Sequence, residues 1–580
     1  MMNVKESERL SIMNHSCAHM LAQAIKRLYP NAKFWVGPVI EEGFYYDIDL
    51  GEDAIKEEDL PRIEQEMKKI SKDGKRITRI EISREEALEM FKDDPYKLDL
   101  IENMDADAVI TAYKQDEFID LCRGPHVEST KELKFFKLLR VSGAYFKGDS
   151  KNKMLQRVYG VCQESQEELD EYLNIIEERK KRDHRKIGKD LSLFMLSDYG
   201  PGLPFWLPKG YKLRRTLENY WLDLHNKNDY QVINTPIMLN RELWETSGHW
   251  DHYKEDMFTI EVEDGTYAVK PMNCPGAILV YNNELHSYRD LPLRYAELGN
   301  VHRYEASGAL NGLFRVRGFT QDDAHTILRE DQVGEEVARI LKLYDEVYSL
   351  FGLDYSIELS TRPEENYIGS IEVWNEAEAA LEKACRATGH DFKINPGDGA
   401  FYGPKLDFKL RDSMNRIWQC GTVQLDMQLP GRFCCTYIAE DGSKKTPVMI
   451  HRACFGSLER FIGIITENYA GAFPVWLTPI QVKVLPVSNK FHLEYAQQVV
   501  KYLCDNGIAA EIDDREEKLG YRMRNVQMQK IPYTLVLGDK EKESMSVNVR
   551  KYGKEGQEPM KPEEFLAYIK EKIASKDSEF

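Results

Sequence analysis

The feature that most constrains the fold is a change of hydrophobic rhythm near LTPIQ, residues 477–481. Before this point, segments such as IWQCGTVQLDMQL, residues 417–429, alternate apolar and polar side chains, and similar alternation recurs from about residue 185 to 475. A period of two places every second side chain on the same face of a strand. This part of the chain is therefore predicted to form an antiparallel sheet with one buried face.

After this point, predicted strands and helices alternate. QVKVLPV reads as a strand, and KFHLEYAQQVVKYLCDNG reads as an amphipathic helix that ends at Asn506 and Gly507. They are followed by a strand in AAEIDD, a helix over residues 519–531, strands in YTLVLGD and SMSVNVR, and a closing helix from Pro562. This order predicts a small α/β domain with a mixed sheet.

A connector is predicted between residue 166 and residue 190. Apolar residues from Leu169 to Ile176 have helical spacing, and Lys and Arg then dominate residues 179–189. The cations suit the negative end of a helix dipole, and they equally suit a surface beside a phosphate backbone. Composition does not decide between these interpretations.

Length and composition narrow the class of protein. A chain of 580 residues is too long for one core, and three domains are expected. No apolar run approaches the ~20 residues of a membrane span, and the N-terminus lacks the apolar region of a signal peptide. Ten unevenly spaced cysteines predict reduced thiols in a cytoplasmic protein. The net charge of -18 disfavours a general polyanion binder but allows nucleic acid on local patches.

Two pairs of soft ligands have metal-like spacing. His15 and His19 lie four residues apart in NHSCAHMLAQAI, a segment without helix breakers, so they share one helix face. Cys122 and His126 are also four apart, in DLCRGPHVE. From the spacing alone, zinc is a serious candidate at this site.

The middle region lacks both common phosphate-binding glycine loops, so phosphate binding must rest on side chains. YAELGNVHRYEASGALNGLFRVRGFTQDDAH reads as strand, long loop and strand, with Arg303 and Glu305 ending the first strand and Arg315, Arg317 and Phe319 entering the second. Arg460 lies in HRACFGSLERFIGIITENYAG, which reads as a helix. Guanidinium forks hold phosphate oxygens and aromatic faces stack on bases, although each arginine taken singly also fits a surface ion pair.

Together these residues resemble a known family. R-x-E, a loop, a second strand and a later G-S-x-E-R helix resemble motifs 2 and 3 of class II aminoacyl-tRNA synthetases. The strings KPMNCPG, RVRGFTQDDAH, GAFYGPK, QCGTVQLD and VMIHR narrow the resemblance to the threonyl-tRNA synthetase family, from about Asn14 to the end of the chain. The family commonly carries a ubiquitin-like domain before its editing domain, for which this sequence has no room. We expect the chemistry to be intact without it.

The resemblance implies an α+β multidomain fold. Its parts would be an N-terminal α+β editing domain, a connector helix, an antiparallel-sheet class II catalytic core and a C-terminal α/β anticodon-binding domain. The expected boundaries are residues 1–165, 166–190, 191–476 and 477–580.

The implied activity is ATP-dependent ligation of L-threonine to tRNA(Thr) through a threonyl-adenylate, with Mg²⁺ accompanying ATP. By resemblance, Arg303 neutralises the α-phosphate, Arg460 holds the far end of a bent ATP, and Phe319 stacks on adenine. His249, in SGHW, matches a family histidine near the terminal ribose of tRNA. The full set expected at ATP is Arg303, Glu305, Arg315, Phe319, Gln419, Thr422 and Arg460.

The resemblance also implies one Zn²⁺ per chain. Threonine and valine are nearly isosteric, so apolar packing separates them poorly, whereas a metal that takes the amine and the hydroxyl separates them well. The implied ligands are Cys274, His325 and His451, three protein ligands with room for substrate. Asp323, two residues before His325 in strand register, is expected to accept the threonine hydroxyl proton. Gln321 and Tyr402 match other positions of the amino-acid pocket.

A zinc ion that selects a hydroxyl does not exclude serine, so a hydrolytic editing site for Ser-tRNA(Thr) is expected. The matching residues are His15, His19, Lys97, Asp120, Cys122 and His126. We interpret this site as metal-free, because a water molecule positioned by imidazoles and the terminal ribose hydroxyl can hydrolyse an ester without a Lewis acid.

The remaining expectations concern assembly and tRNA. NTPIM, residues 234–238, and the helix before it resemble motif 1, which implies a homodimer. Glu541 and Arg550 match family positions that contact the anticodon. Three alternatives fit the sequence less well. An RNA-binding paralogue would be expected to lose motif residues, and a synthetase for another class II amino acid such as proline is disfavoured by the zinc set with Asp323. A free-standing editing hydrolase is excluded by the large core.

Overall fold

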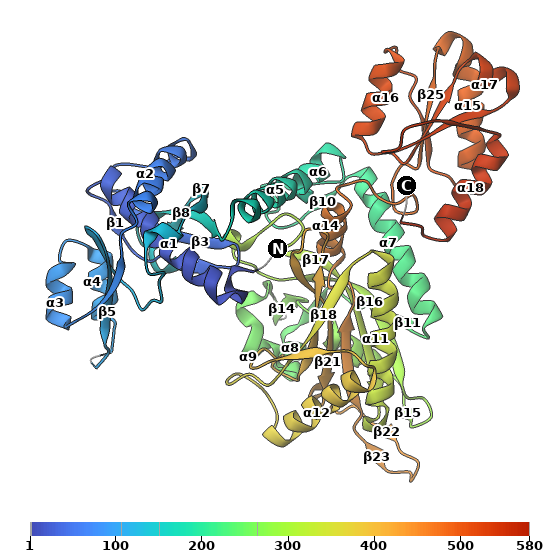
Figure 1. The fold of residues 1–580 in the computed structure, drawn as a ribbon. Coiled ribbons are helices and arrows are strands. Elements are labelled where there is room, and N and C mark those ends of the chain that lie inside the picture. Colours follow the sequence, from blue (N-terminus) through green and yellow to red (C-terminus); the bar gives the residue numbers. More distant parts are fainter. Residues whose placement is uncertain (1–2, 106, 150, 264, 579–580) are drawn as a thin grey trace. The chain divides into compact units, whose positions relative to one another are not determined.

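The computed structural model describes residues 3–105, 107–149, 151–263 and 265–578. These residues form two compact units, Met1–Glu178 and Arg179–Phe580 (Figure 1). Among the described residues, no helix has both the length and the apolar character that a membrane crossing requires.

The first unit is built on an antiparallel sheet of order β1-β3-β8-β7, with β2 paired to β3, and a smaller antiparallel sheet of order β4-β5-β6. Its elements are α1 (Glu8–Leu28), β1 (Lys33–Phe34), β2 (Val39–Ile40), β3 (Gly43–Asp49), α2 (Leu60–Asp73), β4 (Ile77–Ile82), α3 (Arg84–Met90), α4 (Pro95–Glu102), β5 (Ile110–Gln115), β6 (Phe118–Leu121), β7 (Phe135–Tyr145) and β8 (Met154–Gln163).

Helix α1 is the buried centre of this unit and confirms the helix predicted around His15 and His19. Ser7 caps its first turn by accepting from the amide of Leu10 at 3.3 Å. The buried amide group of Asn14 donates to the carbonyl of Cys162 and accepts from its N–H, both at 2.9 Å. This double hydrogen bond fixes α1 against β8 and so sets where the two histidines lie.

The connector differs from the single helix expected over residues 166–190. It consists of α5 (Gln166–Arg182) and α6 (His184–Asp190). The break falls at Asp183, whose carboxylate accepts from the amide of Arg185 at 2.8 Å and caps α6. An aspartate favours the cap position over a helix interior because its side chain satisfies an amide there.

The second unit contains an eight-stranded sheet of order β11-β16-β17-β24-β21-β20-β18-β19. Its pairs are antiparallel except at the two edges, where β11 pairs with β16 and β18 with β19 in parallel, which confirms the predicted antiparallel sheet. The strands are β11 (Gln231–Val232), β16 (Leu293–His302), β17 (Gly318–Leu328), β18 (Asp354–Ser360), β19 (Phe392–Asn395), β20 (Lys405–Arg411), β21 (Ile417–Asp426) and β24 (Val448–Ala453).

Four helices build the largest core with this sheet: α7 (Pro208–Lys227), α11 (Val333–Leu350), α12 (Ile371–Ala387) and α14 (Leu458–Asn468). Two buried tyrosines of α11 bind the backbone at the end of the central strand β24. The hydroxyl of Tyr344 donates to the carbonyl of Ala453 at 2.6 Å, and that of Tyr348 donates to the carbonyl of Cys454 at 2.7 Å. These two hydrogen bonds attach α11 to the central strands of the sheet.

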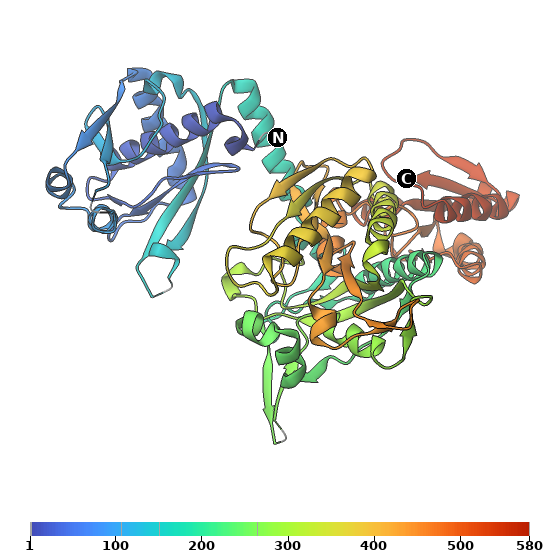
Figure 2. The same cartoon turned by 90° about the horizontal axis from the view of Figure 1, so that it is seen from below.

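Smaller elements surround the sheet. They are β9 (Phe194–Met195), β10 (Phe205–Trp206), β12 (Met238–Asn240), α8 (Arg241–Ser247), α9 (His249–Tyr253), β13 (Thr259–Val262), β14 (Gly265–Val269), α10 (Cys274–Tyr281), β15 (His286–Ser287), α13 (Leu429–Arg432), β22 (Tyr437–Ile438) and β23 (Lys444–Lys445). Figure 2 shows the hairpin of β13 and β14 projecting from the body of this unit.

Two local predictions in this unit are corrected. The segment 451–471, expected as one helix, begins with the end of β24, and the helix α14 starts only at Leu458. All six residues of β24 are buried, so the strand lacks the alternation that distinguishes strand from helix. In the long loop, Arg303 follows β16, and Arg315 and Arg317 precede β17, so only Phe319 lies on a strand.

The C-terminal part has the predicted mixed sheet, in the order β26-β25-β27-β28-β29. The pairs of β25 are parallel and those of β28 are antiparallel. Its elements are β25 (Val482–Pro486), α15 (Asn489–Asp505), β26 (Ala510–Ile512), α16 (Leu519–Met528), β27 (Tyr533–Leu537), α17 (Asp539–Ser544), β28 (Val547–Lys551), β29 (Glu558–Met560) and α18 (Pro562–Ala574). Helix α17 and strand β29 were not expected, and α16 ends three residues earlier than predicted.

Candidate functional site

A large open cavity of about 220 Å³ lies on the eight-stranded sheet. The structure brings the whole expected ATP set to its wall, although these residues come from a loop, two strands and a helix. The seven lining residues of this set are Arg303, Glu305, Arg315, Phe319, Gln419, Thr422 and Arg460. Gln321, expected at the amino-acid pocket, lines the same cavity.

Arg303 and its neighbours form the cationic wall. The guanidinium carbon of Arg303 lies 5.2 Å from the centre of the Phe319 ring, and its Nε donates to the carbonyl of Pro271 at 3.2 Å. Arg315 and Glu305 form an ion pair of 2.8 Å. The aromatic ring and the backbone carbonyl hold the Arg303 side chain in one orientation, which prepares it to meet an anion.

Arg460 reaches the cavity from the first turn of α14. Its Nε donates to the carbonyl of Phe314 at 3.0 Å, and its Nη1 donates to the carbonyl of Gln419 at 2.9 Å. The carbonyls belong to the long loop and to β21 respectively. Two backbone groups therefore set the direction of this cation.

Sequence reasoning missed a buried carboxylate that organises the floor of the cavity. Asp407 accepts from the amide of Gln419 and from the hydroxyl of Ser360, each at 2.8 Å, and pairs with Lys405 at 3.0 Å. Asp407 thereby orients the Gln419 amide. The string GAFYGPK ends at Lys405, but nothing in the local pattern of residues 405–411 distinguishes Asp407 from an ordinary strand residue.

The three expected metal ligands meet at one point. Cys274 begins α10, and His325 and His451 are opposite each other in the β17–β24 register. Their ligand atoms all lie within 4.8 Å of one another. Nε2 of His325 is buried and has no hydrogen-bond partner among the described residues. His451 shares a hydrogen bond of 2.9 Å between its Nε2 and Asp426.

This donor set fits Zn²⁺. One sulfur and two imidazoles are the ligands that zinc prefers, and a carboxylate such as Asp426 commonly orients a ligating imidazole. Burial lowers the pKa of His325 well below its usual value and raises that of Cys274 well above it, so without a cation these two groups are neutral. Zinc binding would displace the thiol proton of Cys274.

Asp323 lies beside this cluster as its strand register predicted. Its Oδ1 is 3.9 Å from Nε2 of His325, and its Oδ2 accepts from the amide of Asn273 at 3.1 Å. The ring of Tyr402 lies 4.9 Å from that of His451, and its hydroxyl donates to Gln424. Asp323 and Tyr402 are therefore adjacent to the expected metal ligands.

His249 is placed against the metal-ligand cluster, and it is not among the described residues that line the large cavity. Its Nε2 lies 3.9 Å from Sγ of Cys274 and 2.9 Å from Sδ of Met272, and its Nδ1 lies 2.8 Å from the hydroxyl of Ser247. Burial, followed by the nearby charge of His451, lowers its pKa to about 3. At neutral pH this imidazole is therefore uncharged.

A second polar cluster occupies the first unit. Sγ of Cys122 lies 3.2 Å from Nε2 of His15 and 3.2 Å from Nε2 of His126. The ring of His126 lies 4.4 Å from those of both His15 and His19, and the hydroxyl of Ser16 is 3.0 Å from its Nδ1. The four residues predicted from two distant segments thus form one site, with ligand atoms within 4.8 Å of one another.

Lys97 and Asp120 form a buried ion pair of 2.5 Å beside this cluster. Nε2 of His19 lies 3.8 Å from the same carboxylate, and the hydroxyl of Tyr46 donates to it. Lys97 also donates to the carbonyl of Trp35 at 2.9 Å. Tyr46 and Ser16 are site residues that sequence reasoning missed.

The protonation of the cluster follows from its burial. Desolvation lowers the pKa of His15 and His126, lowers that of His19 well below its usual value, and raises that of Cys122 to about 11. At neutral pH the site holds neutral imidazoles and a protonated thiol. Such groups orient water and accept protons, whereas a protonated thiol is a poor nucleophile.

The two expected anticodon residues are not brought together. Arg550, on β28, lies opposite Thr534 near the start of β27, and its Nη2 donates to Gln557 at 2.9 Å. Glu541 lies in α17, beyond the end of β27, and accepts from the amide of Gly538 at 2.9 Å. Arg550 lines a hollow with Lys551 and Lys554, which sequence reasoning missed.

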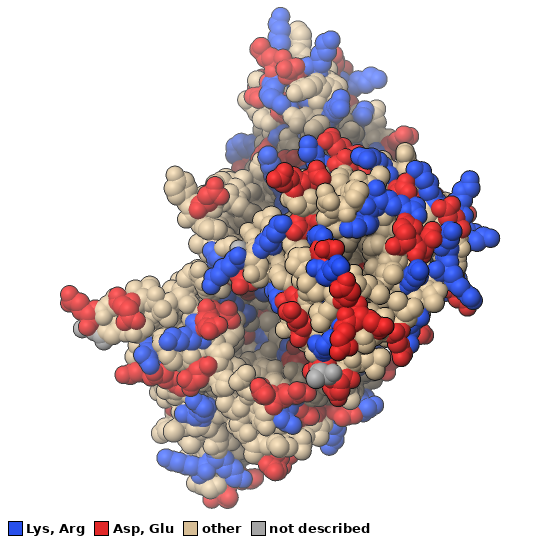
Figure 3. Space-filling model, turned by 90° about the vertical axis from the view of Figure 1, so that its left-hand side faces the viewer, with Lys and Arg blue, Asp and Glu red and all other residues tan. Residues whose placement is uncertain are grey.

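Charged side chains are intermixed on the face shown in Figure 3, where Lys and Arg alternate with Asp and Glu. The net charge of -18 is therefore not a uniform acidic shell on this face. Mixed signs leave local cationic patches, which a nucleic-acid backbone requires.

Comparison with protein families gives three matches. The tRNA synthetase class II core domain (G, H, P, S and T) matches residues 258–469, and the anticodon binding domain matches residues 481–572. The threonyl and alanyl tRNA synthetase second additional domain matches residues 110–159.

Full-length relatives agree. A threonine–tRNA ligase of Clostridioides difficile (strain 630) is 54% identical over 99% of this chain and 90% of its own length. One of Carboxydothermus hydrogenoformans is 54% identical over 98% of this chain and 90% of its own length. The crystal structure of the RNA-binding domain of threonyl-tRNA synthetase from Cryptosporidium parvum Iowa II has a TM-score of 0.66 and 40% identity, over 69% of this chain and 99% of that chain.

Proposed function

The chain belongs to the threonine–tRNA ligase family, and from that premise we propose how its residues carry out the reaction. Its function is the ATP-dependent attachment of L-threonine to tRNA through a threonyl-adenylate, with editing. The observation that carries the residue assignments is the cavity in which Arg303, Arg460 and Phe319 meet. ATP-dependent charging of tRNA with radiolabelled threonine tests the function, and a purified protein that charges no tRNA contradicts it.

We propose that the cavity binds ATP. Charge develops on the phosphoryl oxygens as the threonine carboxylate attacks the α-phosphate, so fixed cations stabilise the transition state. Arg303, oriented by Phe319 and Pro271, neutralises the α-phosphate. Arg460, fixed by two carbonyls, holds the far end of the nucleotide. Mg²⁺ accompanies ATP and shares the phosphate charge.

One Zn²⁺ would be held by Cys274, His325 and His451. When bound, it would supply open positions for the amine and hydroxyl of threonine. The unpartnered Nε2 of His325 and the Asp426 contact of His451 support this assignment. Asp323, held by Asn273, accepts the threonine hydroxyl proton. Gln321 and Tyr402 complete the amino-acid pocket, and His249 serves as a base near the tRNA ribose.

The cluster of the first unit is proposed to hydrolyse Ser-tRNA(Thr) without a metal. Its neutral imidazoles and the thiol of Cys122 orient a water molecule and the tRNA end, with the buried Lys97–Asp120 ion pair beside them. The close ligand atoms of His15, His19, Cys122 and His126 equally suit a metal, so zinc content distinguishes the two interpretations.

We propose a homodimer formed through the motif 1 region. Large apolar side chains are exposed along this segment, which is typical of a surface that another chain covers. They are Tyr211, Val232, Ile237 and Met238. The proposed site of action is the cytoplasm, where the ten free cysteines would stay reduced.

The dimer predicts a solution mass of about twice the 67.4 kDa of one chain. Light scattering after size exclusion measures it, and Met238→Asp should shift the mass toward one chain because it places a charge on the proposed interface. A single-chain mass for the unaltered protein at micromolar concentration would contradict the proposal.

The C-terminal domain is proposed to read the anticodon of tRNA(Thr) with Glu541 and Arg550. Arg550→Ala should lower kcat/KM for tRNA by about 10–100-fold, because each such contact is worth roughly 1–3 kcal/mol. Threonine-dependent pyrophosphate exchange, which needs no tRNA, should be unchanged. Equal charging by the variant and the unaltered protein would remove Arg550 from the interface.

A further inference from the structure

A buried histidine outside the proposed ATP set contacts the loop that builds one wall of the cavity. His184 is 1% exposed, and it lies at the start of α6. Its Nδ1 lies 2.7 Å from a carboxylate oxygen of Glu467, at the end of α14, and its Nε2 accepts from the amide of Leu313 at 2.9 Å. Since Nε2 accepts, the ring proton is on Nδ1 and is donated to Glu467.

The loop is packed closely against this imidazole. Gly312 has a φ of +50°, and a Cβ atom there would come within 2.2 Å of Nε2 of His184. The centre of the Phe314 ring lies 4.0 Å from that of the His184 ring and 4.2 Å from that of the Trp418 ring. Residues 312–314 are therefore held at three consecutive positions by contacts that involve His184.

The residues that His184 holds also help to orient Arg460. Its guanidinium group is held by the carbonyls of Phe314 and Gln419. Phe314 follows Leu313, which His184 binds, and Gln419 follows Trp418, which packs on Phe314. A shift of the Leu313 amide would therefore move one of the two groups that aim Arg460 into the cavity.

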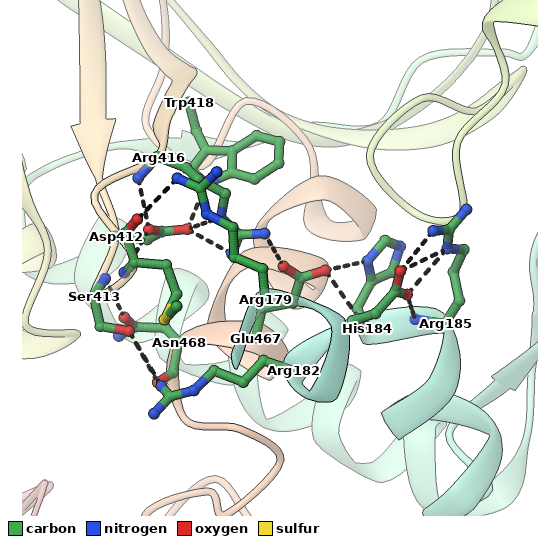
Figure 4. A network of polar contacts seen from close by, with 12 residues as sticks. Arg179, Arg182, His184, Arg185, Asp412, Ser413, Arg416, Trp418, Glu467 and Asn468 are labelled. Carbon is green, nitrogen blue, oxygen red and sulfur yellow. Dashed lines mark hydrogen bonds and ion pairs between the residues drawn. The ribbon is translucent and has the colours of Figure 1, made fainter. Parts of the chain in front are cut away.

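A polar network anchors the other side of the imidazole (Figure 4). Arg416 donates to Glu467 and pairs with Asp412 at 2.7 Å, and Asp412 also accepts from the indole of Trp418 at 2.9 Å. Arg182, at the end of α5, donates to the carbonyl of Asn468 at 3.3 Å. The carboxylate that holds His184 is thus itself held by Arg416, and Arg182 binds the backbone of the next residue, Asn468.

We propose that His184 is a positioning residue for adenylate formation: it fixes the 312–314 backbone and, through the Phe314 carbonyl, the direction of Arg460. The proposal rests on the proposed role of the cavity in binding ATP. His184 touches no substrate. Although Asp183, His184 and Glu467 are close enough to suggest a metal site, both ring nitrogens are already hydrogen-bonded and Asp183 pairs with Arg185.

Two substitutions distinguish the effects of the two hydrogen bonds that the His184 ring makes. Asparagine reaches Glu467 but is too short to accept from Leu313, whereas the amide oxygen of glutamine reaches the position of Nε2. His184→Asn should raise KM for ATP in pyrophosphate exchange by about ten-fold or more, because the buried Leu313 amide loses its acceptor. KM for threonine should stay within about two-fold, and His184→Gln should restore most of the ATP affinity.

A second variant acts from the loop side. Gly312→Ala places a methyl group against Nε2 of His184 and should raise KM for ATP in the same way, which keeps the proposal testable even where His184→Asn does not fold. The matched control is His492→Asn. His492 accepts from the amide of Ser488 at 3.1 Å and contacts Asp539 at 3.0 Å, the same kind of bridge in the C-terminal part. The kinetics of pyrophosphate exchange by His492→Asn should equal those of the unaltered protein.

An unaltered KM for ATP in folded His184→Asn or in Gly312→Ala would overturn the proposal, as would equal rises in KM for ATP and threonine. Equal effects of Asn and Gln would also overturn it, since they would show that acceptance from Leu313 is irrelevant. Failure of the unaltered protein to catalyse any exchange would instead contradict the proposed function of the cavity.

Discussion

Replacement of Cys274 by serine is expected to remove zinc and threonine activation together. The unaltered protein should contain about one zinc per chain, because one thiolate and two imidazoles form a three-ligand site. A serine hydroxyl is a weak zinc ligand, and the two histidines that remain do not hold the ion firmly. Threonine-dependent pyrophosphate exchange should fall by about 10²–10³-fold or more, the scale seen when an electrostatic contact in a transition state is lost.

Metal analysis by plasma mass spectrometry and exchange assays on the same preparation measure both effects. Cys435→Ser is the matched control, because Cys435 is a buried cysteine of the same apolar cluster but lies outside the ligand set. It should keep its zinc and its activity. A Cys274→Ser protein that is free of zinc yet fully active would contradict the assignment of the amino-acid pocket.

The double substitution His15→Ala and His19→Ala is expected to abolish editing without affecting activation. Positioned bases contribute about 10²–10⁴-fold to such reactions, so hydrolysis of Ser-tRNA(Thr) should slow by that order. Serylated tRNA should then accumulate in the presence of ATP and serine. Exchange with threonine should be unchanged, because the two histidines belong to the first unit.

The control for damage to α1 is Gln23→Ala. Gln23 is buried one turn after His19 and donates to Glu117 at 3.0 Å, so its loss perturbs the helix but not the cluster. That variant should still hydrolyse Ser-tRNA. Normal hydrolysis by the double variant would refute the editing assignment, and a second zinc ion that disappears in it would refute the metal-free interpretation.

Local pattern predicted the elements whose periodicity is strong and missed those whose burial hides it. The alternation of residues 417–429 correctly predicted β21, and the segment of His15 and His19 was correctly predicted to be a helix. Strand β24 is buried along its whole length, so its residues were assigned to a helix. The break at Asp183 was missed because the helical spacing before it and the basic run after it overlap.

The site shows a different limit. Cys274, His325 and His451 are far apart in the sequence, so only the family resemblance connected them, and the structure then placed their ligand atoms together. Other residues contact the site only through the fold, by hydrogen bonds to residues that are distant in sequence. They are Asp407, Asp426, Tyr46 and His184. No local spacing reports such contacts, because they depend on which strands and loops become neighbours.

Pyrophosphate exchange with a panel of amino acids tests the central claim most directly. Threonine should give the fastest exchange. Serine, which lacks one methyl group, should be about 10–200-fold slower in kcat/KM, and valine, which lacks the hydroxyl, should be rejected by about 10⁴-fold or more. Exchange that is fastest with valine, proline or any amino acid other than threonine would contradict the account.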